Sequence, residues 1–73
     1  MITSDEFIKI NDWLISKGFR IRVNLTGSNW SYDIYKLDEN YRKYKKVFTS
    51  SKSYSNFKEA SVYGIAKCMS FIV

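Results

Sequence analysis

Residues 19–26 read FRIRVNLT, a segment in which apolar and polar side chains alternate without interruption. Successive side chains of a β-strand point to opposite faces of a sheet, so this alternation predicts a strand that is buried on one face and wet on the other. Residues 26–29 (Thr-Gly-Ser-Asn) follow with turn chemistry, and residues 30–37 place aromatic and aliphatic side chains on one face again. The two segments therefore predict a β-hairpin.

A third strand is predicted over residues 41–49, after a turn at residues 38–40, but its register stays ambiguous. Strict alternation turns either Val47 or Phe48 toward the core, and the choice carries Lys45 or Lys46, respectively, to that same face. A lysine is tolerated there at the edge of a sheet, where its aliphatic stem covers the core and its amine reaches water. The segment therefore predicts an edge strand.

A helix is predicted over residues 4–17. Thr3 and Glu6 form the pattern of a capping box, and Gly18 has the conformational freedom that a helix end requires. Its buried stripe is predicted from helical spacing, with three central residues and three that widen it: Phe7, Ile10 and Leu14, then Ile8, Trp13 and Ile15.

A second helix is predicted over residues 57–71, with Asn56 as its N-terminal cap. Gly64 lies inside this helix, where glycine costs about 1 kcal/mol relative to alanine, which indicates close packing against the sheet. The element order is thus α-β-β-β-α. We expect a single α+β domain over residues 1–73, with a three-stranded antiparallel sheet and two helices on one face.

The residue types argue against an enzyme and against a metal or cofactor site. The chain has no His, which is both the commonest general acid–base group and the commonest metal ligand. Cys68 lies on the apolar stripe of the second helix, where a lone cysteine is expected to behave as a small hydrophobic residue. No glycine-rich phosphate loop or metal-ligand spacing occurs. We therefore expect a non-enzymatic binding module without cofactors.

The segments that would indicate secretion or membrane insertion are missing from this sequence. The first residues are acidic, and the longest wholly apolar run, residues 13–15, is far shorter than the roughly 20 residues that cross a bilayer. A single cysteine also fits a reducing compartment. We expect a cytoplasmic protein that does not use a membrane.

Positive charge is concentrated in the middle of the chain. The formal net charge is +5, and residues 19–53 alone contain eight Lys or Arg and three Asp or Glu. Such a surplus favours an anionic partner such as nucleic acid, whereas the alternative is a charge that serves only solubility.

The third predicted strand carries most of this charge, interleaved with aromatic residues over residues 41–46 (YRKYKK). Tyr41, Lys43 and Lys45 would project from one side and residues 42, 44 and 46 from the other. If the first set points outward, it joins cations and a tyrosine of the hairpin in a surface of the kind that binds single-stranded nucleic acid. The alternative is a solvated edge strand. The candidate nucleic-acid-binding residues are Arg20, Arg22, Tyr35, Tyr41, Arg42, Lys43, Lys45 and Lys46.

A second functional hypothesis is protein interaction. The exposed third strand could pair with a strand of a protein partner or with another copy of the chain. This reading corresponds to an inhibitor or accessory protein of a phage or mobile element.

The α-β-β-β-α order over nearly the whole chain resembles the double-stranded RNA-binding domain. The resemblance implies that family's architecture, in which RNA is contacted by the first helix, the first hairpin loop and lysines at the start of the last helix. Here that loop, residues 26–29, lacks the family's proline and histidine, and the last helix starts with Lys58 alone, so no functional residue is transferred. The residues Phe57-Lys58-Glu59-Ala60 leading to Cys68, with the richness in Lys, Asn, Tyr and Ser, also resemble small orphan proteins of Bacteroidetes and their phages.

Overall fold

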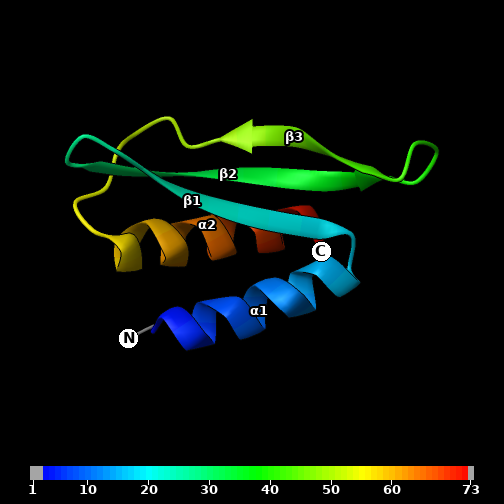
Figure 1. Cartoon of the computed structure of the whole chain (residues 1–73), viewed down its shortest axis with the longest axis horizontal. Coiled ribbons are helices and arrows are strands. Elements are labelled where there is room, and N and C mark those ends of the chain that lie inside the picture. The colour runs from blue at the N-terminus through cyan, green and yellow to red at the C-terminus, as the bar shows by residue number, and fades with distance from the viewer. Residues whose placement is uncertain (1–2, 73) are drawn as a thin grey trace.

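A computed structural model describes residues 3–72 and confirms the predicted α+β fold with the order α-β-β-β-α (Figure 1). The strands form one antiparallel sheet in the order β1-β2-β3. Neither helix in this part of the chain is long and apolar enough to cross a membrane. The elements are α1 (Ser4–Ser16), β1 (Phe19–Thr26), β2 (Asn29–Asp38), β3 (Lys43–Thr49) and α2 (Phe57–Ile72).

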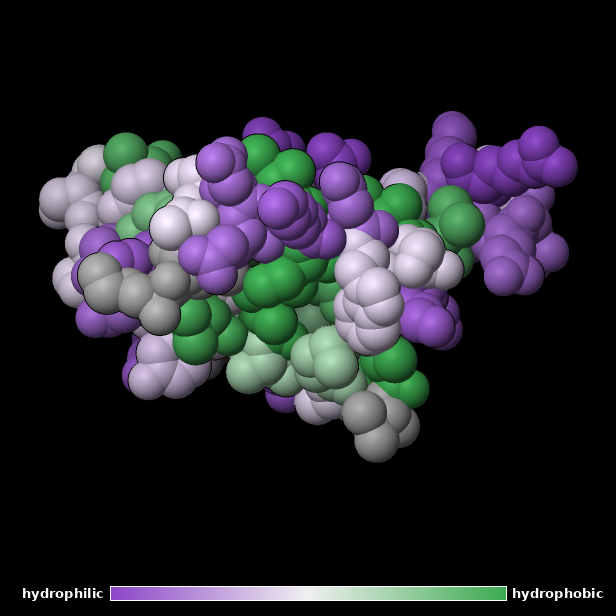
Figure 2. Space-filling view, turned by 90° about the horizontal axis from the view of Figure 1, so that it is seen from below, coloured by the Kyte–Doolittle hydropathy of each residue, from purple (hydrophilic) through white to green (hydrophobic). Residues whose placement is uncertain are grey.

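The molecule has two layers, with both helices on one side of the sheet (Figure 1). Helix α1 packs against β1, and α2 packs against β1 and β2. Seen from the helix side, hydrophobic side chains gather over the helices, and a hydrophilic tip projects beyond them (Figure 2). This tip is the end of the β2–β3 hairpin. Over the opposite face of the sheet, residues 3–72 place no helix or strand (Figure 1).

The core lies between the sheet and the helices, because the apolar residues of β1 and β2 recur at every second position. Cys68 is fully buried in it, as predicted for a small hydrophobic residue. Aromatic edge contacts link the N-terminal ends of the two helices, where the Phe7 and Phe57 ring centroids are 5.5 Å apart. The buried hydrophobic residues are Phe7, Leu14, Phe19, Ile21, Tyr32, Ile34, Tyr54, Ala60 and Cys68.

Helix α1 begins and ends where its sequence predicts, to within one residue. Thr3 and Glu6 form both hydrogen bonds of the capping box, and Gly18 adopts a φ of +85° just after the helix. The predicted width of the buried stripe is wrong: Ile8, Trp13 and Ile15 are 57%, 46% and 40% exposed. Helix α1 packs on β1, the last strand on that side of the sheet, so only a narrow stripe is covered.

Helix α2 confirms the packing reason for a glycine in its middle. A Cβ atom on Gly64 would lie 3.1 Å from Cγ of Tyr32 and 3.4 Å from Cγ2 of Ile21. The helix therefore approaches the sheet more closely than a larger residue allows. At its start, the side-chain oxygen of Asn56 accepts a hydrogen bond from the backbone N–H of Glu59 at 2.8 Å, as expected for an N-terminal cap.

A β-bulge in β3 resolves the ambiguous register. Phe48 lies opposite Ile34 and Lys46 lies opposite Tyr35, so Val47 has no partner on β2. Phe48 faces the helices, where its ring stacks with Tyr32 at 6.0 Å. The extra residue shifts the alternation, and Lys46 therefore points to the uncovered face instead of following Phe48.

The turn between β2 and β3 is longer than predicted and occupies residues 39–42. Asp38 Oδ1 accepts a hydrogen bond from the backbone N–H of Asn40 at 3.0 Å, which stabilises the start of the turn. Arg42 closes it with a φ of +53°, a conformation uncommon for residues other than glycine. The third strand consequently begins at Lys43, two residues later than expected.

Candidate functional site

The uncovered face of the sheet brings together cations and aromatic rings from all three strands. Arg20 of β1 lies opposite Tyr35 of β2, and Tyr35 lies opposite Lys46 of β3. Residues paired in this way share one face, so the row places a tyrosine between two cations. Tyr35 is half-buried, whereas both cations are exposed.

A second row extends this arrangement along the strands. Arg22 follows Arg20 at the next position on the same face, and Tyr44 precedes Lys46 in the same way. Arg20, Arg22, Tyr35 and Tyr44 line an open hollow of about 240 Å³. We call these four residues, together with Lys46, the sheet-face site. Side chains of β1, β2 and β3 thus line one hollow on the uncovered side.

Asp33 also lies on this face, next to the cations, but its carboxylate is buried and already accepts hydrogen bonds from neighbouring side chains. It is 8% exposed, and its two oxygens accept hydrogen bonds from Asn24 Nδ2 at 2.7 Å and from Thr49 Oγ1 at 2.9 Å. Lys46 Nζ lies 4.0 Å from Asp33 Oδ1, with about half of its side chain exposed. A surface ion pair of this kind is weak, so Lys46 can still reach a ligand.

Two predicted site residues lie on the other side of the sheet. The pairing places Lys45 opposite Lys36 and Lys43 opposite Asp38, on the face that carries Phe48 and the helices. Tyr44 and Lys46 take the outward positions instead. The expectation that Lys43 and Lys45 join the cations of β1 is therefore wrong, because the bulge at Val47 offsets the alternation.

Tyr41 and Arg42 belong to the projecting turn and not to β3. Tyr41 is 74% exposed, and its backbone N–H donates to the carbonyl of Asp38 at 3.3 Å. Arg42 has the left-handed conformation that the turn requires. Of the eight predicted residues, Arg20, Arg22, Tyr35 and Lys46 share the sheet face, whereas Tyr41, Arg42, Lys43 and Lys45 lie elsewhere.

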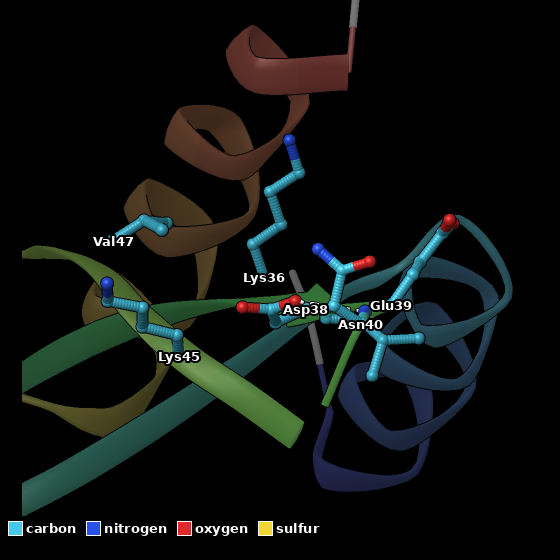
Figure 3. A pocket seen from close by; sticks show the side chains of 7 residues that line it. Lys36, Asp38, Glu39, Asn40, Lys45 and Val47 are labelled. Atoms are coloured by element: carbon cyan, nitrogen blue, oxygen red, sulfur yellow. Dashed lines mark hydrogen bonds between the residues drawn. The ribbon is translucent and has the colours of Figure 1, made fainter. Parts of the chain in front are cut away.

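A larger hollow, of about 540 Å³, lies at the β2–β3 end of the sheet (Figure 3). Its lining combines Lys36 and Lys45 with the carboxylates of Asp38 and Glu39. The two ammonium groups lie apart in this view, and the four charges cancel (Figure 3). This hollow therefore has less attraction for an anion than the sheet-face site.

Catalytic and metal-binding chemistry finds little support among the described residues. Burial raises the pKa of the Cys68 thiol, which disfavours the reactive thiolate. Within residues 3–72, no three His, Cys, Asp or Glu side chains gather in a way that could hold a metal ion.

No protein-family model matches this chain, and neither does any curated protein or solved structure.

Tyr44 and Asp33 were not among the residues predicted from the sequence. Strict alternation from an inward Phe48 would put Tyr44 on the side opposite Tyr35, and the bulge brings the two to one face. Asp33 alternates with Tyr32 and Ile34 and so faces outward. Nothing in the local pattern indicates that partners from two other strands bury it.

Proposed function

We propose that this protein binds nucleic acid through the sheet-face site. The observation that carries the proposal is the convergence of cations from two strands, Arg20 and Arg22 of β1 and Lys46 of β3, on one uncovered side of the sheet. A phosphate backbone is recognised by such cations, because each contact releases a condensed counterion. Guanidinium groups add paired hydrogen bonds to phosphate oxygens.

The surrounding charges support this assignment. Asp33 lies among these cations, but its carboxylate is almost fully buried and accepts hydrogen bonds from Asn24 and Thr49, so little of it is exposed to a ligand. The cations behind the sheet, on β3 and the projecting turn, add a positive field without touching the face. An overall charge of +5 speeds the approach of a polyanion.

The binding surface we propose differs from the one that a double-stranded RNA-binding domain would use. Helix α1 carries Asp5 and Glu6 in its first turn, and α2 begins with Lys58 beside Glu59. Neither helix end has a surplus of positive charge comparable to that of the sheet face. We therefore place nucleic acid on the sheet and not on the helices.

The edge of β3 is a weaker candidate for a protein partner. Three of its seven residues are exposed lysines, Lys43, Lys45 and Lys46, and Val47 forms a bulge. Edge lysines and bulges are features that oppose pairing with another strand. They favour the sheet face over the strand edge as the functional surface.

The experiment that tests the proposal compares two double variants with the same change in net charge. Fluorescence anisotropy with labelled oligonucleotides would be measured at about 50 mM salt, where the electrostatic contribution is large. Arg20→Gln with Arg22→Gln should abolish most binding. Lys43→Gln with Lys45→Gln, on the other side of the sheet, should reduce it only slightly.

The salt dependence gives a second readout. If all three cations of the site contact phosphates of a single strand, log Kobs should fall with log salt with a slope of about −2. Absence of binding by the unmodified protein to single-stranded and duplex probes would refute the proposal. Equal losses in the two double variants would refute the sheet face as the site.

A further inference from the structure

We infer that the nucleic acid is a single strand that places two successive unstacked bases on the site, one on Tyr35 and the next on Tyr44. This inference rests on the proposed function. It adds the class of nucleic acid, the residues that contact bases and the spacing between them.

The spacing of the two tyrosines carries the argument. Tyr35 pairs with Lys46, and Tyr44 lies two residues before Lys46 on β3, so the tyrosines are diagonal neighbours on one face. Diagonal neighbours in an antiparallel sheet are about 7–8 Å apart. Successive bases of a stacked strand are about 3.4 Å apart. Two successive bases that each contact one of these rings are therefore too far apart to stack on each other.

Stacking on the two tyrosines disfavours a duplex as the ligand. In a double helix each base face is covered by its neighbours, and only the base edges and the phosphates are accessible. Rings that lie in a hollow of the sheet, as Tyr35 and Tyr44 do, cannot reach those faces without opening the helix. A single strand exposes them at no such cost, and every base has a face that can stack.

The cations are placed to hold the backbone of such a strand. Lys46 is opposite Tyr35 and next to Tyr44 on the same face, so a phosphate that links the two bases would lie within its reach. Arg20, on the far side of Tyr35, and then Arg22 could hold the phosphate that follows. The strand would run across β3, β2 and β1.

Two neutral hydrogen-bonding side chains on this face are not free to read the edges of bases. The amide of Asn24 and the hydroxyl of Thr49 already donate to Asp33. Stacking does not depend on which base is present, whereas discrimination requires free hydrogen-bonding groups. The site should therefore tolerate most sequences.

The test compares labelled single strands with duplexes of the same length and sequence, at one low salt concentration. The unmodified protein should bind the single strand at least about tenfold more tightly. Tyr35→Ala and Tyr44→Ala should each lower this affinity between about 5-fold and 150-fold, the loss expected for one base–aromatic stack. Tyr35→Phe and Tyr44→Phe, which keep the rings, should bind almost normally. Tyr41→Ala, in the exposed turn, is the matched control and should change little.

A probe without bases makes the test independent of protein variants. An abasic single strand of the same length keeps every phosphate, and the unmodified protein should bind it as weakly as the two alanine variants together bind the normal strand. Equal affinity for single strand and duplex, or for abasic and normal strands, would overturn this inference while leaving nucleic-acid binding intact. Failure to bind any of these probes would overturn the proposed function as well.

Discussion

Asn11 of α1 closes the outer edge of β1 by bonding both backbone groups of Ile21. Its side-chain oxygen accepts from the Ile21 N–H at 3.0 Å, and its side-chain nitrogen donates to the Ile21 carbonyl at 3.1 Å. An added strand would form these same two bonds, so the amide takes the place of a neighbouring strand. The two edge strands of the sheet are thus protected differently from pairing with another strand. This amide protects β1, and lysines and a bulge protect β3.

We expect Asn11→Leu to destabilise the protein, because it leaves the two backbone groups of Ile21 without partners. The loss in the free energy of unfolding should be about 1–3 kcal/mol, measured by urea denaturation. Lys9→Ala, at an exposed position of the same helix, should change it by less than about 0.5 kcal/mol. Similar values for the two variants would contradict a structural role for the amide.

Asp33→Ala should have opposite effects on stability and on binding. Removing the carboxylate leaves the amide of Asn24 and the hydroxyl of Thr49 without their acceptor, at a cost of about 1–3 kcal/mol in the free energy of unfolding. It also removes a negative charge beside Lys46, so affinity for a single strand at low salt should rise by up to about fivefold. Glu39→Gln gives the same change in net charge away from the face and should raise affinity less. A loss of affinity in a folded Asp33→Ala protein would contradict this account of the site.

Gly64→Ala should lower stability even though alanine favours helices. The added methyl group would meet the ring of Tyr32 at 3.1 Å, and Phe48 and Tyr54 stack on that ring, each at a centroid distance of 6.0 Å. Overpacking costs about 1–3 kcal/mol and helix propensity returns about 1 kcal/mol, so we expect a net loss of about 1 kcal/mol in thermal or urea unfolding. A gain of about 1 kcal/mol would mean that the ring moves freely.

Stability should fall at alkaline pH because of Cys68. Burial raises the pKa of its thiol above the value of 9.0 that applies to the exposed group. Above pH 9.0 the unfolded chain releases this proton and the folded chain retains it, so the stabilisation present below that pH is lost as pH rises through the folded pKa. Tyr32, whose pKa is also raised by burial, acts in the same direction from pH 10.0.

Urea denaturation under reducing conditions at about pH 7 and about pH 9.5 would measure this loss. The Cys68→Ala variant is the control. It should be less stable at the lower pH, because it leaves a small cavity, and should lose less on going to the higher pH. An equal pH dependence in the two proteins would show that the thiol does not contribute.

The architecture could be predicted from the sequence, because it follows from local patterns of residues. The alternation in residues 19–26 predicts both β1 and the outward direction of Arg20 and Arg22, and the structure confirms these positions. Thr3, Glu6 and Gly18 mark the ends of α1 as expected. These features depend on residues close together in the chain.

The β3 half of the site depends on contacts between distant parts of the chain. Phe48 faces the core because rings of β2 and α2, Tyr32 and Phe71, contact it, and the bulge at Val47 lets it do so while Lys46 faces outward. A valine at this position gives no indication of a bulge, because valine is common in regular strands. The left-handed conformation of Arg42 could not be predicted either, because glycine is the residue that usually indicates a positive φ.

The unpaired Val47 makes the two surfaces of β3 respond differently to the loss of neighbouring codons. Loss of Val47 itself would make Lys46 the direct neighbour of Phe48, and strict alternation would then keep Lys46 and Tyr44 on the open side and Lys45 on the helix side, where they already lie. Loss of Lys45 instead, with Phe48 still in the core and the bulge retained, would turn Tyr44 toward the helices and Lys43 to the open side. The bulged position is thus the one place in this strand where an in-frame deletion of one residue preserves the chemistry of both surfaces.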